Sequence, residues 1–153
     1  MLECRDLASG ELESLFAPWG IEVVVVPEDQ PIPGSYWGEP EAGILGTRLY
    51  VRPDTPVHSA LHEGCHLVCM GADRRAAVER DAGGDELEEG AVCFLQVALA
   101  DRLPGVGADR LCADMDAWGY SFRTGSTRRW FEEDAEDARG WLARRGISAV
   151  AER

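Results

Sequence analysis

The chain has 153 residues, of which 45% are hydrophobic, and a formal net charge of −13. Its 15 basic residues are all arginine, and the acidic excess disfavours nucleic-acid binding because a phosphate backbone would be repelled. No stretch reaches the roughly 18 apolar residues of a membrane span, and no basic and apolar signal region opens the sequence, so we expect a cytoplasmic protein without membrane contact.

Periodicity and turn signals divide the chain into short strands followed by helices. They predict, in chain order, a helix over 9–16, a strand over 21–26, a long loop over 27–46, a strand over 47–52, a helix over 56–70, a connection over 72–84, helices over 85–102 and 108–118, a loop over 119–125 and a helix over 127–145. This order is typical of an α+β fold, and the length suits one domain over residues 1–153. The aromatic pair Tyr36 and Trp37 of the long loop should cover either a cleft or the edge of the core.

Residues 62–66 read His-Glu-Gly-Cys-His, an H-E-x-x-H pattern inside an apolar run that is compatible with a helix. Two histidines four residues apart lie on one face of a helix and can hold one metal ion between them. Pro56 just upstream suits the first turn of such a helix. Glu63 is rotated by about 100° from His62 around the helix, which would let its carboxylate reach a water on the ion instead of the ion itself.

A catalytic metal site of this kind needs a third protein ligand. His58 extends the histidine series, but three ligands stacked along the helix would span about 12 Å, too far for one ion. The next long helix begins with Glu86, Glu88 and Glu89. Glu88 shares its face with apolar residues and should point inward, whereas Glu89 aligns with Gln96, a polar residue, and should point outward. We therefore expect Glu88 as the third ligand, with Glu89 as the alternative.

Together these residues resemble the zincin metalloproteins, specifically their gluzincin-like members. In those proteins an H-E-x-x-H helix is followed by a helix that donates Glu from an E-x-x-A pattern, which residues 88–91 match, with Phe94 where related small zincins carry Phe. The resemblance implies a small zincin-like domain in which a short sheet packs against both helices. It also implies that His62, His66 and Glu88 bind zinc and that Glu63 is the general base.

Part of the chain, over about residues 45–100, also resembles the elongation factor P hydroxylase family. The resemblance is carried by Arg48-Leu49-Tyr50-Val51, Ser59-Ala60-Leu61-His62-Glu63 and Arg74-Arg75, although the segment between His66 and Glu88 is shorter than in that family. It implies a metal-dependent oxygenase that modifies a protein side chain.

Three functions therefore follow from the sequence. The first is a zinc peptidase in which Glu63 activates a metal-bound water for attack on a protein or peptide substrate. Tyr120 or Arg123, in the loop over 119–125, could then supply an oxyanion donor. The second is the oxygenase, with Fe²⁺ in place of Zn²⁺, because two histidines and a carboxylate also bind non-haem iron. The third is a non-catalytic binding protein of zincin fold.

The five cysteines form an odd set in a chain without an export signal, so we expect reduced thiols that do not bind the metal. Cys69 is the one serious rival to a glutamate ligand, since it lies on the same helix face one turn beyond His66. An ion held between the two histidines would be about as far from Cys69 as from His58.

Replacing Cys69 by Ser should accordingly leave the bound metal unchanged, as measured by elemental analysis of the purified protein. Loss of the metal in that variant would instead indicate a site of two histidines and a cysteine.

Overall fold

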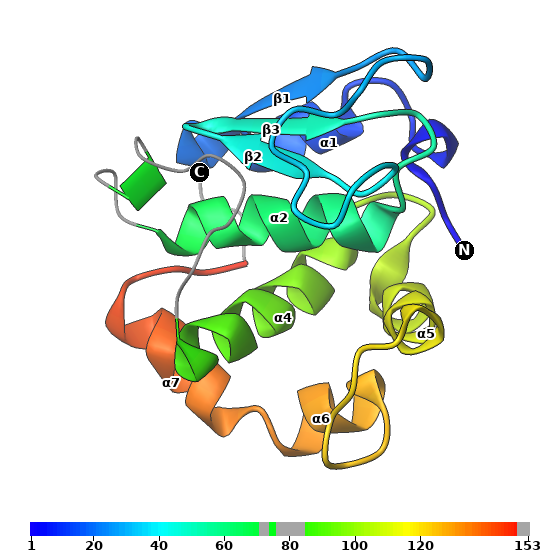
Figure 1. Ribbon diagram of the computed structural model, residues 1–153. Coiled ribbons are helices and arrows are strands. Elements are labelled where there is room, and N and C mark those ends of the chain that lie inside the picture. Colours follow the sequence, from blue (N-terminus) through cyan, green and yellow to red (C-terminus); the bar gives the residue numbers. More distant parts are fainter. Residues whose placement is uncertain (71–73, 76–84, 150–153) are drawn as a thin grey trace.

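A small mixed sheet and a larger helical part form the computed structural model, which describes residues 1–70, 74–75 and 85–149 (Figure 1). The strands are β1 (Glu22–Val25), β2 (Gly43–Leu45) and β3 (Arg48–Val51), in the order β1-β3-β2. Strand β1 runs parallel to β3, and β2 runs antiparallel to it. The predicted α+β class is confirmed, whereas most of the connection predicted over 72–84 lies outside the described residues.

Strand β2 corrects the prediction of an uninterrupted loop over 27–46. It is only three residues long, too short to show an alternating pattern, and it exists because Ile44 pairs with Leu49 and is fully buried. Gly43 begins the strand where the preceding loop crosses closely, so that a Cβ atom there would overlap the backbone of Pro33.

The helices follow the predicted order closely. They are α1 (Glu11–Phe16), α2 (Val57–Cys69), α4 (Glu86–Ala100), α5 (Gly107–Trp118), α6 (Thr127–Glu133) and α7 (Glu136–Arg144), with short 3-10 turns at Cys4–Asp6 and Ala17–Trp19. Helix α2 lies between the sheet and α4, and α7 packs on the far side of α4 (Figure 1). Within the described part of the chain, no helix combines the length and apolar character needed to cross a membrane.

The helix predicted over 127–145 is interrupted and forms α6 and α7 instead. Two hydrogen bonds of 2.7 and 2.6 Å from the Arg123 guanidinium hold the carboxylate of Asp134 at the break. Helix α6 packs against α5 while α7 packs against α4, and one straight helix could not follow both neighbours. Both helices still direct apolar side chains into the core, namely Trp130, Ala138, Trp141 and Leu142.

Helix α2 is almost entirely buried, and both of its ends are fixed by neighbouring segments. At its C-terminus the Arg75 side chain donates hydrogen bonds to the carbonyl oxygens of Leu67, at 2.6 Å, and Trp19, at 2.9 Å. A cation at this end also interacts favourably with the helix dipole. Arg75 thereby ties the C-terminal end of α2 to the 3-10 turn that ends at Trp19.

Gly64, within the H-E-x-x-H pattern, lies where α2 passes closest to α1. A Cβ atom added to Gly64 would overlap the aromatic ring of Phe16, which is itself completely buried. The glycine is therefore required by packing between these two helices and has no contact role in the histidine cluster.

Replacing Gly64 by Ala should lower the free energy of unfolding by about 1–3 kcal/mol, because the added methyl group overpacks the core. Denaturant unfolding measures this change. Gly90→Ala in α4 is the matched control, since its Cβ would meet no neighbouring atom within 4 Å. That change should be neutral or stabilising by up to about 1 kcal/mol. In the double variant Phe16→Leu/Gly64→Ala, the loss should be smaller than the sum of the two single losses; a simple sum would contradict the assigned contact.

Candidate metal centre

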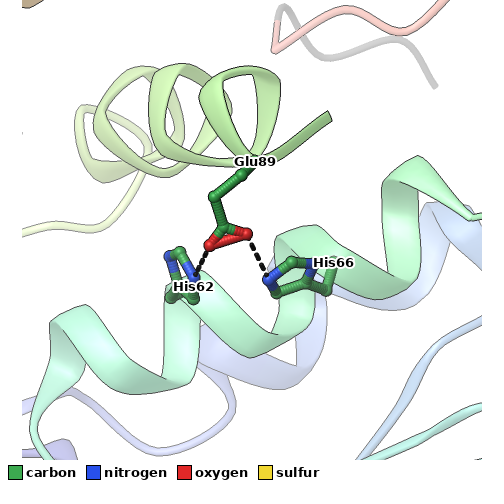
Figure 2. Close-up of side chains that lie close together, drawn as sticks. All are labelled: His62, His66 and Glu89. Atoms are coloured by element: carbon green, nitrogen blue, oxygen red, sulfur yellow. Dashed lines mark hydrogen bonds and ion pairs between the residues drawn. The ribbon is translucent and has the colours of Figure 1, made fainter. Parts of the chain in front are cut away.

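Three side chains from the two central helices converge on one point. His62 and His66 project from α2 toward α4, and the carboxylate of Glu89 on α4 lies between them (Figure 2). One carboxylate oxygen is 3.1 Å from His62 Nε2, and the other is 3.1 Å from His66 Nε2. The cluster offers two imidazole nitrogens and one carboxylate oxygen as ligand atoms. This is a common ligand set for Zn²⁺ and Fe²⁺.

The separations within the cluster suit a shared divalent ion. Ligand atoms bound to one tetrahedral zinc at about 2.0–2.1 Å lie about 3.3 Å from one another. The three donor atoms from His62, His66 and Glu89 all lie within 4.8 Å of one another. The three residues therefore lie within metal-binding distance of one another.

His62 is oriented by a buried amide. The Oε1 atom of Gln96 lies 2.9 Å from His62 Nδ1, and the amide nitrogen of Gln96 donates to the His58 carbonyl oxygen and the Tyr120 hydroxyl at 2.8 and 3.2 Å. Because the amide nitrogen is committed to two acceptors, its oxygen faces His62, and Nδ1 must donate. Nε2 is then directed at Glu89, the arrangement in which an outer partner orients a metal-binding imidazole.

The charges in the cluster stabilise one another. Burial disfavours the charged form of His62, but Tyr120, Cys93 and Glu89 favour it, and the pKa of His62 lies well above its ordinary value. Burial likewise opposes ionisation of Glu89, yet its hydrogen bonds with both histidines hold its pKa well below the usual range. In this form His62 is an imidazolium that donates from both nitrogens, and a metal ion would replace the proton on Nε2.

Glu88 does not join the cluster, which corrects the expected choice of third ligand. Its side chain is buried, at 7% exposed, as the apolar face predicted, but its carboxylate accepts a hydrogen bond from Arg74 at 2.8 Å. Glu89, at 50% exposed, faces the histidines instead. Glu89 is exposed, as expected, but its carboxylate turns toward the histidines, because its helix face continues to Gln96, which is completely buried against His62.

Glu63 lies at the same centre but outside the group of three ligands. The residue is 7% exposed, and its carboxylate forms no hydrogen bond with another described side chain. Burial raises the pKa of Glu63, and the nearby His62 and His66 partly offset that effect. A carboxylate with a raised pKa accepts a proton more readily than one in water.

Of the two candidates for an oxyanion donor, only Tyr120 lies at the site. Its ring is 5.8 Å from that of His62, and its hydroxyl is 3.3 Å from Nδ1 of His58. Burial raises the pKa of Tyr120 to about 12, so the hydroxyl keeps its proton and remains a potential donor. Arg123 instead pairs with Asp134 at the α6–α7 break.

His58 is buried and does not bind the cluster. Burial lowers the pKa of His58 to about 4, so the ring is neutral at pH 7. Its position beside Tyr120 supports the hydroxyl network that ends at Gln96. The structure thus agrees with the exclusion of His58 as a ligand and places its ring in the buried network behind the cluster.

A cleft of about 410 Å³ gives access to the cluster. Its lining combines aromatic rings, acidic groups and small residues: Trp37, Glu41, Ser59, His62, Glu63, Glu86, Glu89, Gly90, Cys93, Trp118, Tyr120, Ser121, Phe122 and Trp130. Of the aromatic pair in the long loop before β2, Trp37 lines the cleft, while Tyr36 packs edge to face against Trp37. The five cysteines are free thiols, and Cys93 is the one that lines the cleft.

Comparison with known proteins identified no relative of this chain. No protein-family model matches the chain, and searches of curated proteins and of solved structures found no match.

Replacing Glu89 by Gln should weaken zinc binding by more than about 100-fold, because removing an outer partner of a ligand already costs about 10–100-fold. Competition with a chromophoric chelator measures the affinity. Glu88→Gln, one residue earlier in α4, is the matched control and should change zinc affinity by less than about threefold. His66→Ala should lose the metal. A larger loss for Glu88→Gln than for Glu89→Gln would reinstate Glu88 as the ligand.

Proposed function

We propose that this protein is a metal-dependent hydrolase, with zinc as the metal and a peptide bond as the bond cleaved. The observation that carries the proposal is the approach of Glu89 to both histidines beside a cleft that Glu63 also lines. Three ligands from the protein would leave one position open to a small molecule, which is the usual difference between catalytic and structural zinc sites.

In this proposal the metal supplies Lewis acidity, which polarises a carbonyl group and lowers the pKa of water toward about 7. Glu63 takes a proton from the attacking water and passes it to the leaving amine. The raised pKa of Glu63, caused by burial, suits a group that must hold the proton between these two transfers. Tyr120 is positioned to donate its hydroxyl proton as a hydrogen bond to the oxygen of the substrate.

A second candidate is supported by the donor set itself. Two histidines and one glutamate also bind Fe²⁺ in oxygenases that use non-haem iron. Metal analysis of the protein as isolated separates the candidates: zinc favours the hydrolase, iron favours the oxygenase, and a protein that binds neither supports a non-catalytic role.

The proposal predicts that Glu63→Gln retains its zinc but loses at least about 100-fold in turnover, the usual contribution of a general base. Cleavage of a mixed peptide library by the zinc-loaded protein, followed by mass spectrometry, measures turnover. Removal of zinc by a chelator should abolish cleavage, and readdition should restore it. Near wild-type turnover by Glu63→Gln would exclude the general-base role, and the absence of cleavage by the zinc-loaded wild type would exclude the peptidase.

A further inference from the structure

The lining of the cleft is strongly acidic, and its basic group, His62, lies at the inner end beside Glu89. Four glutamates line the cleft: Glu41, Glu63, Glu86 and Glu89. Among the described residues that line it there is no arginine, and the sequence contains no lysine. Glu89 pairs with His62 and His66, whereas the other three carboxylates form no ion pair within the described chain.

Glu41 is the most informative of these acids. It lies in the loop just before β2 and is half-buried, and it has no ion-pair partner within the described chain. Burial raises the pKa of Glu41, while hydrogen bonds with Ser59 and Trp118 and the nearby His62 partly offset the effect. Glu41 thus has hydrogen-bond partners but no direct ion pair among the described residues, and a cationic group of a ligand in the cleft would supply one.

Glu63 gives a second, independent indication of a ligand. This residue is more than nine-tenths buried and lines the cleft, yet its carboxylate forms no hydrogen bond with any described group. Both Glu41 and the histidine cluster contribute to its electrostatic surroundings, so the acidic lining is continuous from the metal centre to the loop before β2.

Aromatic rings form the wall beside Glu41. Trp37 and Trp118 meet edge to face, with ring centroids 5.8 Å apart, and Trp118 in turn contacts Tyr120 at 5.5 Å. Trp37 is 62% exposed, although a tryptophan normally covers apolar surface. Indole faces attract cations, and the planar guanidinium group of arginine stacks on them better than an ammonium group does.

We propose that the cleft between Glu41 and the Trp37–Trp118 pair binds the guanidinium group of an arginine side chain, and that arginine-containing peptides are the substrate class. The second half of this statement rests on the proposed hydrolase function. The first half concerns binding alone and holds whether or not the bound peptide is cleaved.

Binding is tested on the wild-type protein in the presence of a chelator, so that no turnover occurs. The probes are Ac-Ala-Arg-Ala-amide and its citrulline counterpart, which keeps the shape of the side chain but lacks the charge. Tryptophan fluorescence follows the titration. We expect the arginine peptide to bind about tenfold more tightly, as suits a hydrogen-bonded charge pair. The lysine peptide should fall between the two.

Two variants test the residues assigned. Glu41→Gln should reduce the preference for arginine over citrulline to less than about twofold, whereas Glu13→Gln, the same charge change on the exposed side of α1, should retain it. Trp37→Ala removes an exposed side chain and should weaken arginine binding about threefold without affecting stability. Equal binding of the two peptides, absence of binding, or a preference that survives Glu41→Gln would overturn the assignment.

The two proposals fail in distinguishable ways. Peptide binding with the arginine preference but without cleavage by the zinc-loaded protein would remove the hydrolase and leave the guanidinium site. Cleavage without preference for arginine would support the hydrolase and remove the guanidinium site.

Discussion

The packing of α4 against α2 is the constraint on which the candidate site depends. Both helices are held by apolar contacts along their length, and this packing sets the distance and rotation between them. The Glu89 carboxylate can reach both imidazoles only because that rotation places it above the gap between His62 and His66 (Figure 2). A rotation of α4 by one residue, about 100°, would direct a different side chain at the histidines.

Each position of the H-E-x-x-H segment has a separate task in this packing. The two histidines face α4, and Glu63 faces the cleft. Gly64 makes room for the ring of Phe16, and Cys65 is fully buried in the core. Gly64 and Cys65, the two positions that the pattern leaves variable, are thus also constrained. Their constraint is steric packing and not a role in binding or catalysis.

The sequence predicted the parts of this arrangement that local periodicity controls. The helix carrying His62 and His66, the following helix and the burial of Glu88 all appear as expected, because each depends on residues near in sequence. The third member of the cluster was missed because burial was taken as the sign of a ligand. The charge of the buried Glu88 is instead compensated by Arg74, and local helix periodicity does not predict this contact.

A better signal was present in α4. Gln96 is seven residues, nearly two helical turns, after Glu89, and a polar side chain within an apolar stretch marks the face that needs a polar partner. Because the helix face of Glu89 and Gln96 was interpreted as solvent-exposed, Glu88 was preferred to Glu89 as the third ligand. The break between α6 and α7 and the short strand β2 were inaccessible for a related reason, since both depend on contacts with distant segments.

The carboxylates of the cleft also have a kinetic consequence. On a chain of net charge −13, a recessed group of like charges focuses the electric field and concentrates divalent cations near the opening. An ion would therefore arrive at the histidines faster than by unaided diffusion, and this advantage would diminish as added salt shortens the screening length. If the proposed site binds a metal, the acidic lining would set the rate of metal loading, while the three ligand atoms would set how tightly the ion is retained.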